Sequence, residues 1–249
     1  MDRDRRRAVT VIGALGLIAP LRAQSRRYAI LSLVGDRIEI VFAQPGIGSN
    51  IDRNNRRAVE GAQGAIDQLM FQVIERTLRR EQPGTSASML ALPGSVLFDK
   101  PERLFDGRQI ALPGSVVDAI DASQATHLIV LTKWRDTVRA PLQDRTVGVG
   151  HVRGLGFYVD SDIRLVMRES GESGSGLLAP FVYVRMTLVD AQSGDVIREE
   201  MIRSMQTYST ASNPKAGIPW EVLSAQEKIE ALQQLIDRSI GEATTRLLR

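Results

Sequence analysis

The sequence predicts an α+β fold, with a mostly antiparallel sheet that contains a long hairpin and is covered by two main helices. The hairpin is predicted by two β-rich runs, residues 181–189 and 195–202, which flank a polar turn containing Gly194. Alternate residues of the first run are apolar and share one face of the strand: Val182, Val184, Met186 and Leu188. That face requires a cover, which the two helices would supply.

Both helices are predicted from apolar residues at helical spacing. The first covers residues 62–80 and ends before Pro83-Gly84. The second begins at the capping box Ser224-Ala-Gln-Glu227. It continues as a single apolar stripe, which we expect to pack on the hairpin: Ile229, Leu232, Ile236, Ile240 and Leu247.

The other expected elements are shorter. Residues 28–34 and 37–42 are strand-like runs joined by Gly35-Asp36, which predicts a tight hairpin. Residues 44–57 are rich in turn formers and predict a solvated loop. The continuous apolar run 126–134 predicts a central strand. The motif Ala-Leu-Pro-Gly-Ser-Val occurs at 91–96 and again at 111–116, where it leads into a short helix over 116–122.

Residues 1–23 have the layout of a secretory signal peptide. A basic start that includes Arg5, Arg6 and Arg7 precedes an apolar run over 8–21, and Ala23 offers a cleavage site. A short buried helix or an uncleaved anchor is the alternative. The arginines partly resemble a twin-arginine signal, so the export route, Sec or Tat, stays open. We therefore expect a single periplasmic domain over 24–249, with no stable membrane span after cleavage.

Composition limits the classes of function. Of the 32 basic and 29 acidic residues, the leader holds five and two, which leaves 27 of each. This balance leaves no excess of positive charge that would attract nucleic acid or an anionic membrane. Cysteine is absent, which excludes disulfides, thiolate chemistry and the lipid-modified cysteine of bacterial lipoproteins.

Candidate chemical groups are few. The two histidines, His127 and His151, show no zinc-like spacing, and His127 is expected to be a satisfied core residue. Gly148-Val-Gly-His-Val-Arg-Gly154 fails the dinucleotide fingerprint by one residue. Asp160 is expected to be a solvated turn former. We expect no metal and no cofactor.

The glycine-punctuated stretch 146–176 is the predicted partner-binding region. Its glycines would loosen the backbone, and functional residues concentrate on such loops. The predicted contacts combine aromatic anchors with nearby arginines: Arg153, Phe157, Tyr158, Arg164 and Arg168. In the alternative interpretation Phe157 packs in the core and the glycines form bulges or turns.

Several motifs resemble those of known envelope proteins. Leu188-Val-Asp-Ala-Gln-Ser-Gly-Asp-Val196 and Thr126-His-Leu-Ile-Val-Leu131 resemble the hairpin and central strand of three families. These are the N-terminal domain of the Tol–Pal translocation protein, the curli secretion lipoprotein and the penicillin-binding-protein activators. Leu31-Ser-Leu-Val-Gly-Asp36 and Gly154-Leu-Gly-Phe-Tyr-Val-Asp160 are similar to uncharacterised exported proteobacterial proteins. The resemblance implies an envelope domain that binds other proteins and is not an enzyme.

The sequence therefore predicts a non-catalytic periplasmic envelope protein that acts through protein–protein interaction. Two alternatives stay open: a periplasmic hydrolase and a small-ligand carrier, each with a site near His151 and Asp160. The alternatives predict a deep pocket with convergent polar groups, whereas a partner binder should expose an apolar patch. The partner's identity and the oligomeric state are not predicted.

Overall fold

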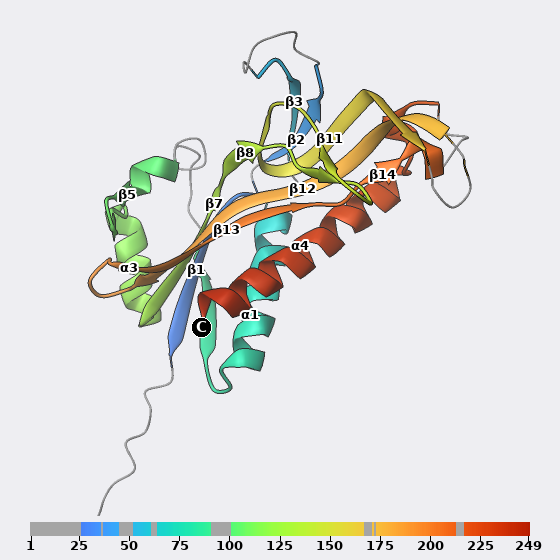
Figure 1. Cartoon of the computed structure of the whole chain (residues 1–249). Coiled ribbons are helices and arrows are strands. Elements are labelled where there is room, and N and C mark those ends of the chain that lie inside the picture. The colour runs from blue at the N-terminus through green and yellow to red at the C-terminus, as the bar shows by residue number, and fades with distance from the viewer. Residues whose placement is uncertain are drawn as a thin grey trace, which may run out of the picture.

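The fold is built around one large mixed sheet (Figure 1). A computed structural model describes residues 26–35, 37–44, 52–60, 64–90, 101–166, 171, 173–212 and 217–249. The strands are β1 Arg27–Leu33, β2 Arg37–Phe42, β3 Asn55–Glu60, β4 Ser86–Leu90, β5 Phe105–Asp106, β6 Gln109–Ile110, β7 His127–Lys133, β8 Arg135–Thr137, β9 Ala140–Pro141, β10 Thr146–Val147, β11 His151–Val166, β12 Ser173–Asp190, β13 Val196–Met205 and β14 Tyr208–Ser209. The helices are α1 Ala65–Glu81, α3 Gly114–Ser123 and α4 Ala225–Leu247, with short 3-10 turns η1 Pro101–Leu104, η2 Thr210–Ser212 and η3 Pro219–Glu221.

The long hairpin is confirmed as β12–β13. Its strands pair antiparallel over most of their length, with Val184 opposite Ile202. The turn is held by Asp190, whose Oδ1 accepts the backbone N–H groups of Gln192 and Ser193, each at 2.9 Å. Such a side-chain bond to the following backbone is the reason Asp favours turns.

The sheet has two sections that share β12, and its order is β3-β2-β11-β12-β7-β1-β4. One edge of β12 pairs antiparallel with β11 along its first half and with β7 along its second half. β1 then pairs parallel with β7 and β4, and β2 pairs parallel with β11. The α+β class is therefore confirmed, but the expectation of a mostly antiparallel sheet was wrong.

The predicted hairpin between β1 and β2 was also wrong. The two strands follow each other along the chain but pair with different neighbours, β1 with β7 and β2 with β11. The step between them is fixed by Asp67 of α1, whose Oδ1 accepts the Ser32 hydroxyl and, at 3.0 Å, the Gly35 N–H. The hydrogen bond from Gly35 to Asp67 thus fixes the chain at the point where the Gly-Asp pair was expected to form a hairpin turn.

Helices α1 and α4 cover one face of the sheet, as predicted (Figure 1). They bury the apolar side of β12, including Val184 and Met186. The capping box at Ser224 and Glu227 is present at the start of α4. Four of the five stripe residues are buried, whereas Ile229 is 52% exposed. None of the described helices is long and apolar enough to cross a membrane.

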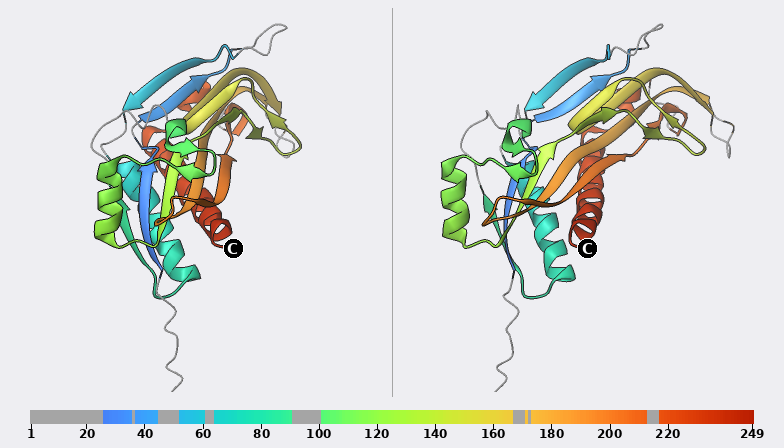
Figure 2. Two further views of the ribbon diagram at one scale, coloured as in Figure 1. Left: turned by 90° about the vertical axis from the view of Figure 1, so that its left-hand side faces the viewer. Right: turned by 60° about the vertical axis from the view of Figure 1, so that its left-hand side comes forward.

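Two separate groups of elements cover the opposite face (Figure 2). Helix α3 and its neighbouring η1, β5 and β6 bury apolar side chains of β1 and β7. The segment that contains β8, β9 and β10 buries those of β11 and the first half of β12. The sheet is therefore enclosed between α1 and α4 on one side and these two covers on the other.

Three further expectations are corrected. Residues 55–57 of the expected loop belong to the fully exposed edge strand β3. Within the glycine-punctuated stretch 146–176, residues 173–176 open β12 and residues 151–166 form β11. The motif copy at 91–96 lies outside the described residues, while the helix expected after the second copy is α3.

Candidate functional site

An apolar groove opens between α1, α4 and the β2–β3 pair. It has a volume of about 510 Å³. Its lining comes from the six elements β2, β3, α1, β11, η3 and α4: Ile38, Ile40, Val59, Ala65, Ile66, Leu69, Phe157, Trp220, Ala225, Lys228, Ile229, Leu232, Gln233 and Ile236. Only two of these side chains are polar, so the groove can hold apolar groups but offers no set of catalytic residues.

The floor of the groove is packed into the core and its rims are exposed. Phe157 meets the Trp220 ring edge to face, with centroids 5.7 Å apart and planes at 86°. Phe157 is buried among the core residues together with Ile236. At the rims, Val59 on β3 is 41% exposed and Ile229 on α4 is 52% exposed. Large aliphatic side chains that flank a concave apolar surface mark a binding site better than scattered ones do.

Lys228 is the one charged side chain in the lining. Its Nζ donates a hydrogen bond of 2.6 Å to the Leu223 carbonyl and lies 4.5 Å from the centre of the Trp220 ring. Burial lowers the pKa of Lys228, an effect that the nearby Glu221 and Glu227 oppose. The groove therefore has a cation at one position of an otherwise apolar wall.

The structure does not bring together the four predicted contact residues that it describes. Phe157 and Tyr158 alternate along β11 and point to opposite faces, one into the core under the helices and the other into the core under β8–β10. Arg153 is half-buried near the start of β11 and Arg164 is exposed near its end. Arg168 lies outside the described residues.

Tyr158 is fully buried and has a structural environment. Its hydroxyl accepts the Val149 N–H at 3.0 Å and donates to Asp160 Oδ2 at 3.4 Å. Burial raises the pKa of Tyr158 far above its ordinary value. Asp160 is itself buried, and its Oδ1 accepts the N–H groups of Asp162 and Ile163 at 3.0 and 3.2 Å. Neither residue presents its polar group as a docking contact.

His127 has local partners, whereas His151 Nδ1 is buried and makes no hydrogen bond to the described residues. His127 is half-buried, with Nδ1 2.8 Å from the Thr126 hydroxyl and its ring 5.3 Å from that of Tyr28. Burial lowers its pKa. His151 Nδ1 lies 3.6 Å from Asp52 Oδ2. Neither His151 nor Asp160 lines the apolar groove, and the described residues contain no group of three or more potential metal ligands.

Comparison with known proteins gives likenesses of fold alone. The sequence matches no protein-family model and no curated protein sequence. The structure is similar to a DUF330 protein from Xanthomonas campestris, with 10% identity over 90% of this chain and 85% of that one, and a TM-score of 0.43. It is also similar to a neuraminyllactose-binding hemagglutinin homolog from Helicobacter pylori, with 11% identity over 90% and 86% of the chains and a TM-score of 0.41. A third likeness is to the PelC dodecamer of Paraburkholderia phytofirmans, with 11% identity over 90% and 87% and a TM-score of 0.31.

No functional conclusion rests on these likenesses. The resemblances to the Tol–Pal, curli and penicillin-binding-protein activator families remain predictions.

Proposed function

We propose that this is an exported, non-catalytic envelope protein that binds a partner protein through the apolar groove. The observation that carries the proposal is the open apolar groove, which has a volume of about 510 Å³ and exposed aliphatic residues on two sides. A groove between two helices and a strand pair suits an amphipathic helix, which inserts apolar side chains at spacings of three and four residues.

The charge of the groove defines the partner further. Lys228 is the single charged lining residue, and its ammonium group is partly desolvated against Trp220. An acidic side chain on the partner helix would complement it, because an opposite charge offsets the cost of covering Lys228. The expected partner is therefore a helix with one apolar face and an acidic residue beside that face.

A small-ligand carrier is the second candidate. The groove lies within the range of roughly 300–1,000 Å³ that small-molecule sites occupy. Its aromatic floor of Phe157 and Trp220 would suit an apolar chain. This candidate places the ligand in the groove and away from His151 and Asp160.

Site-specific photo-crosslinking separates the two candidates. A photoreactive amino acid is placed at position 229 or at position 234 of the full chain. The chain is then expressed in bacteria that export it to the envelope, where it is crosslinked. Gln234 is exposed on α4 but does not line the groove. We expect a discrete protein adduct from 229 and none from 234, with an amphipathic acidic helix as the crosslinked peptide. A lipid-sized adduct from 229 would identify a carrier, and equal adducts from both positions would contradict the proposal.

Binding of the identified peptide then tests the groove directly. Ile229→Asp should weaken binding at least tenfold, because burying one aliphatic side chain contributes about 1.5–3 kcal/mol and tenfold corresponds to about 1.4 kcal/mol. Ile229 is 52% exposed, so the new carboxylate stays in contact with water and the fold should persist. Gln234→Asp is the matched control and should bind as the wild type does. Equal binding by both variants would exclude the groove.

A further inference from the structure

Arg57 of β3 places a second positive charge beside the apolar groove, on a different wall from Lys228. Val59 of β3 lines the groove, and the two-residue alternation of a strand directs Arg57 to the same side. The β2–β3 register agrees, because Arg57 lies opposite Ile40 and Val59 lies opposite Ile38. Both isoleucines line the groove. Lys228 belongs to α4, so the two cations approach the groove from separate elements.

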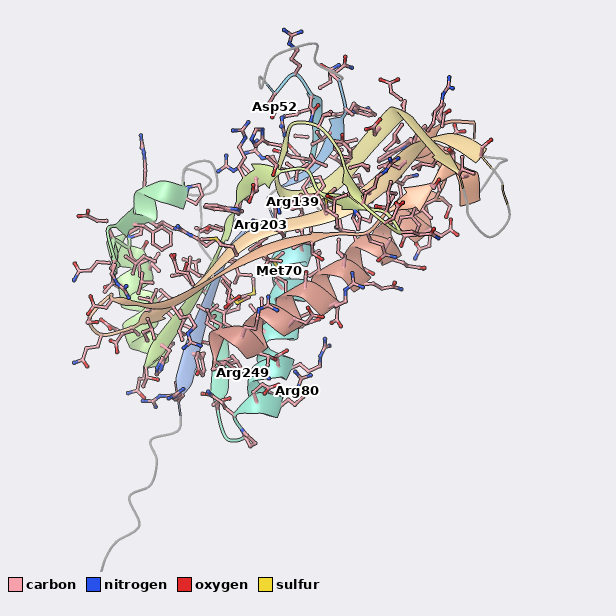
Figure 3. All side chains as sticks on the ribbon, in the orientation of Figure 1. Asp52, Met70, Arg80, Arg139, Arg203 and Arg249 are labelled. Atoms are coloured by element: carbon pink, nitrogen blue, oxygen red, sulfur yellow. The ribbon has the colours of Figure 1, made fainter. Side chains whose placement is uncertain are left out.

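The charge of Arg57 is not offset by a neighbour. Arg57 is exposed and forms no ion pair with any residue that the structure describes. The adjacent Arg56 alternates to the other face, where its guanidinium lies 3.2 Å from Glu39 Oε2 and 2.6 Å from Asp52 Oδ2. Asp52 lies beside the start of β3 (Figure 3). Glu60 alternates to the face of Arg56, so Arg57 is the arginine of β3 whose charge stays open to a partner.

Lys228 has acidic groups near it, but within the described part of the chain it forms no ion pair. Glu227 belongs to the capping box, in which its Oε2 accepts the Ser224 N–H at 2.7 Å. Glu221 also lies close enough to favour the charged form of Lys228. These acids partly offset the charge of Lys228, whereas no described carboxylate lies within ion-pair distance of Arg57. The β3 wall therefore has the more open cation.

We propose that Arg57 is a specificity-determining residue of the groove, and that the partner helix carries acidic residues on both flanks of its apolar face. This inference rests on the proposed function, because it concerns a helix bound in the apolar groove. Such a helix turns its apolar face to the floor and one flank to each wall. Acidic flanks would face Arg57 and Lys228, and basic flanks would be repelled by them. Arg57 thus selects among helices that have similar apolar faces.

Three synthetic peptides test the inference with the full chain. They share one amphipathic helix with leucines at spacings of three and four residues. Their flanks carry glutamate on both sides, glutamate and glutamine, or glutamate and lysine. Fluorescence anisotropy measures binding. An exposed ion pair changes affinity by about two- to fivefold, so the wild type should prefer the first peptide to the second by that factor and bind the third most weakly. Added salt should reduce these differences, because Arg57 is exposed.

Reversing the charge at position 57 should reverse the preference. Arg57→Glu should bind the glutamate–lysine peptide more tightly than the peptide with two acidic flanks, because the lysine flank then faces a carboxylate. Arg139→Glu is the matched control, since it changes the net charge equally. Arg139 is exposed between β8 and β9, in the segment that covers the opposite face of the sheet (Figure 3). This variant should keep the wild-type order, and circular dichroism checks that both variants are folded.

The outcomes separate this inference from the proposed function. If the wild type binds all three peptides equally, and Ile229→Asp weakens each of them, the groove binds helices but Arg57 does not select them. An unchanged order in Arg57→Glu would overturn the inference in the same way. If the wild type binds none of the peptides, or Ile229→Asp binds them all as tightly as the wild type does, the groove is not a helix site and both proposals fail.

Discussion

Among the glycines that the structure describes, Gly156 on β11 leaves the least room for a single added carbon. Gly156 pairs with Glu39 of β2 in the parallel part of the sheet. A Cβ there would overlap the Glu39 carbonyl oxygen and lie 2.7 Å from its carbonyl carbon and 2.9 Å from Cζ of Phe181. A carbon normally approaches a carbonyl oxygen only to about 3.3 Å. Gly156→Ala must therefore push β2 away from β11.

The magnitude follows from what that displacement breaks. Overpacking a core by a methyl group costs about 1–3 kcal/mol. The shift also disturbs the ladder between β2 and β11, in which each net hydrogen bond contributes about 0.5–1.5 kcal/mol. We expect Gly156→Ala to lower the free energy of unfolding by about 3 kcal/mol. Because Ile38 and Ile40 of β2 line the apolar groove, the same variant should also weaken any ligand bound there.

Gly241→Ala is the matched control. Gly241 lies within α4, and a Cβ there would meet Thr77 Oγ1 at 3.7 Å and Val73 Cγ1 at 3.8 Å, which are ordinary contacts. Alanine is favoured over glycine in a helix by about 0.8–1 kcal/mol, so this variant should be more stable than the wild type. Both variants restrict the unfolded chain equally, so their difference reports the native clash. Urea unfolding followed by circular dichroism measures it, and a loss below about 1 kcal/mol for Gly156→Ala would refute the reasoning.

Two further predictions concern packing and export. Ile236→Ala should cost about 2–5 kcal/mol in the same unfolding assay, because Ile236 of α4 is buried in the core under the sheet's helix-covered face; a loss below about 0.5 kcal/mol would mean that α4 is not packed there. Mass spectrometry of periplasmic protein should find a mature chain that begins near Gln24, as the basic start, apolar run and Ala23 predict. Full-length chain in the cytoplasm alone would contradict export.

Elements with strong periodicity could be predicted from the sequence. The β12–β13 hairpin, both long helices and β7 follow from apolar residues repeated at strand or helix spacing. The edge strand β3 could not, because Asn-Arg-Arg-Ala-Val-Glu is exposed along its whole length and has no buried face. Its pairing with β2 is made by the backbone, and such bonds leave no pattern in the side chains.

Glycines misled the prediction for β11 and β12. Gly154 and Gly176 have φ values of +70° and +104°, so glycine is needed there, but within strands and not in loops. The pairing of β11 with β12 shifts register between Asp160 and Arg164, as at a β-bulge. Phe157 lies in the core, as the alternative interpretation expected, and Gly176 of β12 lies opposite the register shift.

The apolar groove had one signal in the sequence. Ile229 belongs to the stripe that was expected to face the hairpin. It is instead 52% exposed and lines the groove. The other walls come from β2, α1 and η3, whose approach depends on long-range packing. Periodicity shows that a helix has an apolar face, but it does not show how far the opposite layer extends beneath that face.

The two sections of the sheet follow from the same long strand that organises the hairpin. β12 is long enough to pair with β11 and β7 in turn along one edge, and the exchange between them leaves an opening where neither strand is continuous. Side-chain alternation on β12 then separates Val184, beneath the helices, from Arg185, at the opening. A helix bound in the apolar groove would therefore lie on the helix-covered side of the sheet and leave Arg185 on the other face untouched.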